Sequence, residues 1–238
     1  MADVIAPQNQ ALANFPFNDV AQGISNLPFY GGNHIEEDGG LQDTNIFSNS
    51  SFYSSYIVHK VYGNELHQYT LSLTKEFDLS FGAPRIVNGT VIVNVPMGFG
   101  DAKDGDWGQE AGVRGVFTLY HVDVNDNETA LGGGSKQTED FEESSIADNG
   151  QYGTIFCEFF SVSNQKFRRG EKLRLKVQLY AYTNSAHYVV FGIGCDPQNR
   201  NDFEGNGVEG GDSSKAWKCF PDSVDTNLII QVPFKIDV

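Results

Sequence analysis

Apolar and polar residues alternate along most of the chain after residue 56, which is the pattern of β-strands with one face in a core. The alternation is clear over residues 69–74, 91–95 and 116–124. From residue 173 to 179, leucine or valine occupies every second position, with lysine, arginine and glutamine in the neighbouring positions. These segments predict strands rather than helices.

Two further segments extend this pattern. Residues 188–193 are continuously apolar, as expected of a strand that is covered on both faces. Residues 228–236 present one apolar face, and Pro233 falls on the opposite face. Proline has no N–H to donate to a sheet, so this strand is expected to lie at an edge or to carry a bulge there.

With an apolar stretch at 155–162, these segments amount to about eight strands, and no long amphipathic helix is indicated. We therefore expect residues 57–238 to form an all-β domain. The expected architecture is an antiparallel two-sheet β-sandwich, jelly-roll-like, with long loops at about 98–112, 132–152 and 196–225.

Residues 1–56 differ from the rest of the chain because they contain six acidic residues and no lysine or arginine. Prolines at 7, 16 and 28 exclude a long helix. We interpret the segment as an extended N-terminal arm that must lie on its own subunit or reach a neighbour, since it cannot bury its own aromatic residues. The alternative is a disordered tail. Its candidate partner-binding residues are Phe15, Phe17, Phe29 and Tyr30.

The formal net charge of −15 opposes binding to phosphate backbones, so no nucleic-acid partner is expected. Five of the sixteen basic residues nevertheless fall between positions 168 and 176. This basic stripe predicts contact with the acidic arm or loops of another copy. An ordinary solvent-facing strand whose cations pair with acids on adjacent strands is the alternative. The stripe consists of Arg168, Arg169, Lys172, Arg174 and Lys176.

Two acidic segments are candidates for a cation site. Asp123, Asn125 and Asn127 match the first ligand positions of a calcium loop, but Glu128 and Gly134 stand where the loop needs glycine and glutamate. A hairpin turn closed by asparagine and aspartate side chains accounts for the same residues. The loop at 98–112 carries four carboxylates, but their spacing matches no defined cage: Asp101, Asp104, Asp106 and Glu110. We expect no metal and no cofactor.

The sequence carries no G-x-S-x-G, H-E-x-x-H or P-loop motif, and its five histidines are scattered, with His67 and His121 at ordinary strand positions. The acidic runs at 36–38 and 139–143 are interpreted as solvated surface. Three cysteines, at 157, 195 and 219, favour free buried thiols, although one pair could bridge. No signal peptide and no membrane-spanning stretch is expected. The protein is therefore not expected to be an enzyme or to bind a membrane.

The segments GVFTLYHVDVNDNETALG, KFRRGEKLRLKVQLYA and NLIIQVPFKI together resemble β-sandwich virion proteins of tailed double-stranded-DNA viruses. The resemblance covers about residues 60–238. It implies an auxiliary capsid, turret or tail component that is located in the virion, forms homo-oligomers and contacts other virion proteins. A carbohydrate-binding module or receptor-binding lectin-like domain is the alternative, and a hydrolase is a more distant one. In the carbohydrate-binding alternative, the stacking surfaces would come from Trp107, Tyr180, Tyr182, Tyr188 and Trp217.

Overall fold

The structure is a computed structural model that describes residues 24–34, 44–49, 58–62, 66–101, 110–147, 150–184, 189–197 and 219–235. The regular structure of these residues is entirely β, which confirms the predicted class. The strands are β1 (Ile24–His34), β2 (Thr44–Ser48), β3 (Val58–Tyr62), β4 (Leu66–Ser80), β5 (Arg85–Asp101), β6 (Ala111–Val122), β7 (Glu128–Ala130), β8 (Lys136–Gln137), β9 (Phe141–Glu143), β10 (Gln151–Phe167), β11 (Lys172–Thr183), β12 (Val189–Ile193) and β13 (Leu228–Lys235).

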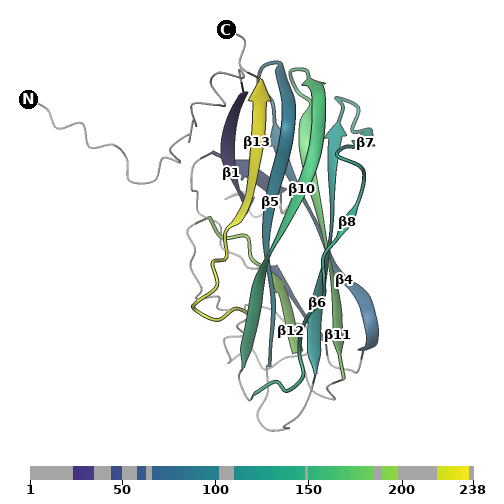
Figure 1. Cartoon of the computed structure of the whole chain (residues 1–238), viewed down its shortest axis with the longest axis vertical. Coiled ribbons are helices and arrows are strands. Elements are labelled where there is room, and N and C mark those ends of the chain that lie inside the picture. Colours follow the sequence, from purple (N-terminus) through teal and green to yellow (C-terminus); the bar gives the residue numbers. More distant parts are fainter. Residues whose placement is uncertain are drawn as a thin grey trace, which may run out of the picture.

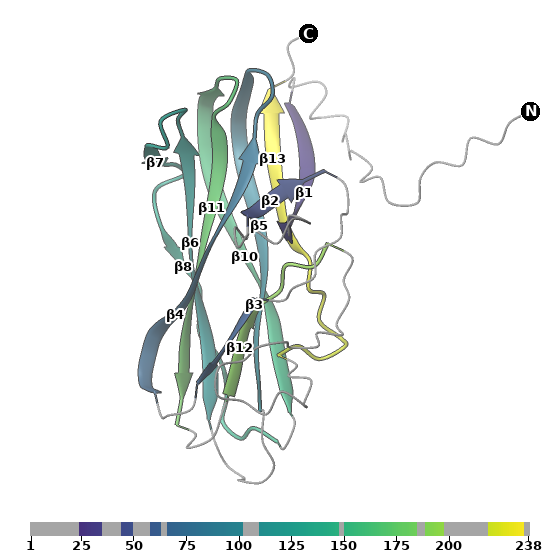
Figure 2. The ribbon, with the colours of Figure 1, turned by 180° about the vertical axis from the view of Figure 1, so that it is seen from behind.

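These strands form one mixed sheet that curls into an elongated half-barrel (Figure 1). Its hydrogen-bonded order is β3-β12-β5-β13-β1-β2-β4-β11-β6-β7, with β10 paired to β5, and β8 and β9 paired to β6. Seen from behind, β4 crosses the molecule diagonally, and β2 lies beside β1 (Figure 2). The long strands run close to the long axis of the molecule, so its two ends are built from turns and strand ends.

This architecture corrects the expectation of an antiparallel two-sheet sandwich of about eight strands. The described residues contain a thirteen-stranded sheet, and one of its pairings, between β2 and β4 at Ile46 and Asp78, is parallel. The difference arises from β1 and β2, which join the two sides of the curled sheet by hydrogen bonds. Strands β7, β8 and β9 are two or three residues long, too short to show a period in the sequence.

Strands β1 and β2 come from the segment interpreted as an arm. Strand β1 pairs with β13 over eight residue pairs, from Ile24 opposite Lys235 to Gly31 opposite Leu228. Phe29 is buried, with its ring 6.1 Å from that of Phe234 in an edge-to-face arrangement. This part of the segment therefore belongs to the core sheet of its own subunit. Phe15 and Phe17 lie outside the described residues.

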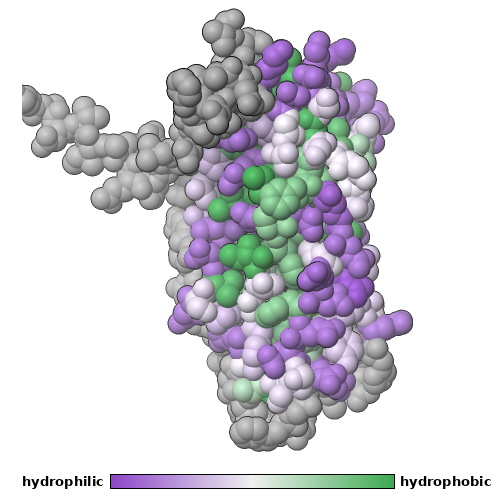
Figure 3. Space-filling view, viewed as in Figure 1, coloured by the Kyte–Doolittle hydropathy of each residue, from purple (hydrophilic) through white to green (hydrophobic). Residues whose placement is uncertain are grey.

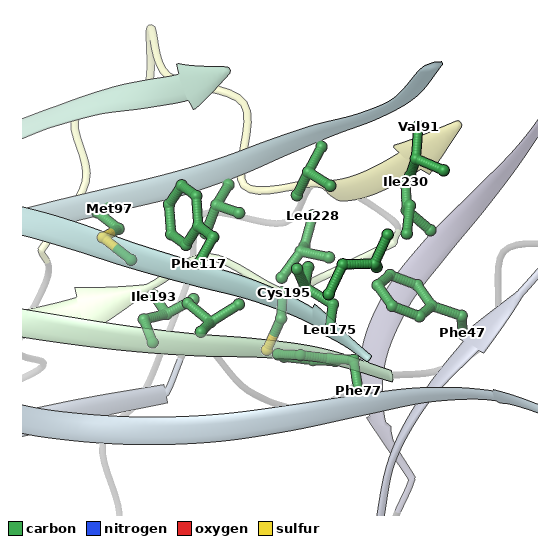
Figure 4. Close-up of a cluster of buried hydrophobic side chains, with 14 of the residues drawn as sticks. Phe47, Phe77, Val91, Met97, Phe117, Leu175, Ile193, Cys195, Leu228 and Ile230 are labelled. Atoms are coloured by element: carbon green, nitrogen blue, oxygen red, sulfur yellow. The ribbon is translucent and has the colours of Figure 1, made fainter. Parts of the chain in front are cut away.

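The core lies between the two sides of the curled sheet and follows the predicted alternation. The inward residues of β11 are fully buried and meet inward residues of β4, β5 and β13. Figure 4 shows such side chains converging from several strands, among them Phe77, Val91, Met97, Phe117, Leu175 and Ile230. Burial of each large apolar side chain contributes about 1.5–3 kcal/mol, so this interior is the main source of stability.

Two local predictions can be compared with the strands directly. All five residues of β12 are buried, as expected for the continuous apolar run. Strand β13 is not an edge strand, because it pairs with β1 and β5. Its pairing with β5 shifts register between Gln231 and Phe234, which confirms the bulge alternative for Pro233.

No helix long and apolar enough to span a bilayer occurs among the described residues.

Candidate protein-contact sites

An apolar patch lies on the outer face of the β10–β5–β13 side of the sheet. We call it the β10 patch and define it as Ile92, Ile155, Phe159 and Ile229. Phe159 lies opposite Ile92, while Cys157 and Ile229 lie on either side of Asn94. The side chains of Phe159 and Ile155 are 53% and 43% exposed. The space-filling view shows apolar surface gathered along the middle of this face, between more hydrophilic regions (Figure 3).

Strand β10 is also an edge strand in the described part of the chain. It spans seventeen residues and, among the described strands, hydrogen-bonds only to β5. Beside its other edge runs a groove of about 360 Å³ against residues 138–141. A long edge strand with apolar side chains presents both unpaired backbone groups and surface that gains from burial. Sequence reasoning identified residues 155–162 as a strand but could not find the patch, because apolar residues occupy both of its faces.

A cavity of about 1080 Å³ lies at the end of the molecule where β1 begins and β13 ends. We call it the end cavity. The turn between β4 and β5 and the turn between β10 and β11 complete its wall. Its floor is apolar and includes Leu27, Phe29, Leu79, Phe81, Phe167 and Phe234. Its charged and ionisable lining residues are Arg85, His121, Lys166, Arg168, Glu171 and Lys235.

His121 and Glu171 form a hydrogen-bonded clasp in the wall of this cavity. The Nε2 of His121 is 2.8 Å from Oε2 of Glu171, and its Nδ1 is 3.0 Å from Nε2 of Gln165. The same Glu171 oxygen accepts a hydrogen bond of 2.7 Å from the backbone N–H of Arg168. That backbone donor, with His121, lowers the pKa of Glu171. Both ring nitrogens of His121 are engaged, so the geometry is that of a packed strand residue.

The basic stripe is paired within the chain over β11. The guanidinium of Arg174 binds Asp78 through two hydrogen bonds of 2.7 and 2.8 Å and also lies 2.9 Å from Glu128. Lys172 is near Asp78 and Asp126, and Lys176 is 3.2 Å from Glu76. The hydrogen bond with Asp78 is the main reason that the pKa of Arg174 is raised. Lys172, Arg174 and Lys176 therefore follow the alternative interpretation, in which the cations of the strand pair with nearby acids of the same chain.

The two remaining basic residues of the stripe lie in the turn before β11. Arg168 and Arg169 are exposed, and Arg168 lines the end cavity. Tyr30, the last arm residue predicted to bind a partner, is half-buried in β1. Binding of a partner by Arg168, Arg169 or Tyr30 stays a prediction. The predicted partner-binding residue Phe29 is instead buried in the core of its own subunit.

The acidic turn at 123–127 is a hairpin corner, as interpreted from the sequence. Asp123 accepts hydrogen bonds from the backbone N–H groups of Asn125 and Asn127, at 2.7 and 2.9 Å. It also accepts one from the Asn127 side chain, which lowers the pKa of Asp123. Asp126 adopts φ of 60°, the left-handed conformation that aspartate tolerates in turns.

The predicted acidic loop is only partly described, since Asp104, Asp106 and Trp107 lie outside the described residues. Glu110, at its end, accepts a hydrogen bond of 2.8 Å from the hydroxyl of Tyr182. Across the described part of the chain, no group of three or more His, Cys, Asp or Glu residues is arranged to hold a metal ion. Cys157 and Cys219 are free thiols; Cys195 and Cys219 are buried as predicted, but Cys157 is exposed.

Two tyrosines of the carbohydrate alternative can be placed. The ring of Tyr182 lies 5.7 Å from that of Tyr69, and the guanidinium of Arg114 stacks 4.2 Å above Tyr69. The hydroxyl of Tyr69 donates to Glu142 at 2.8 Å, and burial with this hydrogen bond raises the pKa of Tyr69. Tyr180 is half-buried on the same strand as Tyr182, whereas Tyr188 and Trp217 are not among the described residues.

Comparison with known proteins yields structural likeness alone. No family model matches the chain, and no curated protein matches it. A CocE/NonD family hydrolase from Staphylococcus aureus superposes with a TM-score of 0.40 at 11% identity, over 88% of this chain and 36% of that chain. An α-amino acid ester hydrolase gives 0.44 at 10% identity, over 87% and 36%.

A structure of infectious bursal disease virus, Gx strain, gives a TM-score of 0.20 at 11% identity, over 86% of this chain and 41% of that chain. The chain thus spans less than half the length of each of these proteins.

Proposed function

We propose that this protein is a non-enzymatic structural component of a virus particle, a capsid-associated decoration, turret or tail protein that acts through contacts with its own copies and with other virion proteins. The virion assignment is supported by the sequence resemblance over residues 60–238. The proposal includes a jelly-roll-like arrangement of the curled sheet as the body of each subunit. The single observation that carries the contact role is the exposed β10 patch on an edge strand.

Burial of this patch supplies the driving force for association. Phe159 and Ile155 are already about half buried, so covering them fully is worth about 0.7–1.5 kcal/mol for each side chain. Pairing the free edge of β10 with a strand of another copy satisfies backbone groups that otherwise bind water. The net charge of −15 opposes indiscriminate clustering of copies, so only a well-fitting contact overcomes it.

The two sides of the sheet differ in a way that fits this role. Outside β4 and β11, the carboxylates of Glu76 and Asp78 pair with cations of the same chain. That surface is satisfied and solvated. The β10 patch has no such polar network, so it is the surface that gains most from a partner.

Native mass measured by light scattering or sedimentation tests the contact. We expect the full chain to form a defined oligomer and the variant Ile155→Ser/Phe159→Ser to associate at least about tenfold more weakly, because two anchors are lost. The matched control is Leu71→Ser/Val124→Ser, which removes two exposed apolar side chains elsewhere and should leave the mass unchanged. A full chain that is monomeric at all concentrations, or a patch variant that assembles normally, contradicts the contact role.

Cys157 gives an independent readout, since it lies between Ile155 and Phe159 in the strand, while Cys195 and Cys219 are buried. Its alkylation by a maleimide should slow as the protein assembles. The virion assignment has its own test, which is mass spectrometry of purified virus particles. A fixed ratio of this chain to the major shell protein supports it, and loss of the chain on purification contradicts it.

A carbohydrate-binding role is the second candidate, favoured by the cluster of Tyr69, Tyr182 and Arg114 with nearby carboxylates. Aromatic rings and carboxylates together can bind sugar rings. A glycan array with the full chain and with Tyr182→Ala tests it. Reproducible binding that the substitution abolishes would favour this role over the structural one.

A further inference from the structure

The end cavity combines an apolar floor with a cationic rim. Arg85, Lys166, Arg168 and Lys235 are four of the sixteen basic residues in a chain of net charge −15. None of their side chains forms an ion pair with another described residue, in contrast to the paired cations of β11. Glu171 is the one carboxylate in the lining, and it is held by His121. This lining suits an occupant that is apolar and carries negative charge.

Residues 1–23 of the chain have that chemistry. They contain Asp3 and Asp19, no lysine or arginine, and the sequence Phe-Pro-Phe at 15–17. Proline fixes its own backbone and disfavours helix for the residue before it, so the sequence of this tripeptide favours an extended backbone. In an extended chain, Phe15 and Phe17 project to the same side. Two aromatic rings on one side and an aspartate two residues later match an apolar floor with a cationic rim.

The segment is also tethered beside the cavity. Strand β1 begins at Ile24, which lies opposite Lys235, a lining residue. Phe17 precedes Ile24 by seven positions, so an extended chain lets it reach up to about 25 Å from the rim. This tether gives the segment a high effective concentration at the cavity of its own subunit.

We infer that the end cavity is the receptor for the protein's own N-terminal segment, with Phe15 and Phe17 seated on the apolar floor and Asp19 facing the cationic rim. The inference goes beyond the proposed function and does not depend on it, since the tether alone places the segment beside the cavity of its own subunit. It assigns a role to the two arm aromatics that lie outside the described residues.

Photo-crosslinking in the full chain tests the inference. With p-benzoylphenylalanine at position 17, we expect irradiation to produce crosslinks that mass spectrometry maps to residues 79–86 and 166–168. The charge reversal Arg85→Glu/Lys166→Glu should lower their yield at least about tenfold. Lys75→Glu/Arg169→Glu makes the same change in charge outside the lining and should leave the yield unchanged. The probe at position 71, on an exposed part of β4, should not crosslink to the cavity.

Crosslinks that map elsewhere, an unchanged yield after charge reversal, or an acyl lipid that native mass spectrometry finds in the cavity would each overturn the inference. The size of the crosslinked product separates it from the proposed function. Covalent dimers support both, because the segment then joins two copies. Monomers crosslinked at the cavity support the inference and remove the segment from assembly. The native mass of the Ile155→Ser/Phe159→Ser variant still tests assembly in either case.

Discussion

Glu171 shows how one carboxylate holds together turns and strands at the end of the molecule. It is 7% exposed, accepts a backbone hydrogen bond from Arg168 and contacts His121 of β6. The backbone of Glu171 also accepts a hydrogen bond from Phe81, so this residue ties the β10–β11 turn to the end of β4. The wall of the end cavity therefore depends on the charge of this residue.

The stability that Glu171 provides should depend on pH. Its folded-state pKa is lowered, so its contribution is present above the unfolded value of about 4.3 and is lost as pH falls through the folded value. We expect Glu171→Gln to reduce the free energy of unfolding by about 1–2 kcal/mol at pH 7. Urea denaturation of both proteins from pH 7 to pH 3 checks this. A difference that stays constant down to pH 3 would contradict the role of the charge.

At the scale of elements, the cations of β11 show what alternation predicts and what it leaves open. We call Lys172, Arg174 and Lys176, with the carboxylates that they pair with, the β11 ladder. The alternation placed Lys172, Arg174 and Lys176 on the outer face correctly, because a strand of period two permits only two faces. It could not decide between pairing within the chain and pairing with a partner. That outcome depends on register, and the register that sets Arg174 opposite Asp78 pairs residues 96 positions apart in the sequence.

The β11 ladder predicts that substitutions of its cations reduce the free energy of unfolding by unequal amounts. Arg174→Ala leaves Asp78, Glu76 and Glu128 without their shared partner, and should reduce the free energy of unfolding by about 1–3 kcal/mol. Arg174→Lys should recover only part of this, because lysine cannot form the two-bond fork. Lys176→Ala, in a more exposed pair, should cost under about 1 kcal/mol. Equal denaturant midpoints for the two alanine variants would contradict the central role of Arg174.

Strands β1 and β2 were missed because local signals oppose them. Pro28, Gly31 and Gly32 are typical of turns, yet they lie inside β1. Pairing with β13 on one side and β2 on the other overrides these preferences. At Gly31 an added Cβ would lie 2.6 Å from the side chain of Leu228, so close packing rather than a turn favours glycine there. Such a requirement is visible only once the partner strand is known.

For the whole molecule, the end cavity was not predictable because its cations are far apart in sequence. Arg85, Lys166 and Lys235 come from β5, β10 and β13, whereas the cluster visible in the sequence proved to be largely paired along β11. The all-β class could be predicted, since it needs only alternation. The curled single sheet could not, because it rests on the few hydrogen bonds by which β2 reaches β4.

Ionic strength distinguishes the ways in which copies could associate. Copies with net charge −15 repel one another, and raising salt from about 0.01 M to about 0.1 M shortens the Debye length from about 30 to about 10 Å. If the β10 patch is the contact, the oligomeric fraction in sedimentation velocity should rise with salt. Contacts between cations and acids of different copies would weaken instead. The Ile155→Ser/Phe159→Ser variant should show a lower oligomeric fraction than the unchanged protein under both conditions.

The pairing of β1 with β13 has a consequence for biosynthesis. Strand β1 is synthesised before the other described strands, but β13, one of its two neighbours in the sheet, is synthesised after all of them. Until then, Phe29 lacks its contact with Phe234, and the edge of β5 that pairs with β13 is uncovered. Closure becomes a late, long-range event, which makes folding slow and gives chaperones a window in which to act.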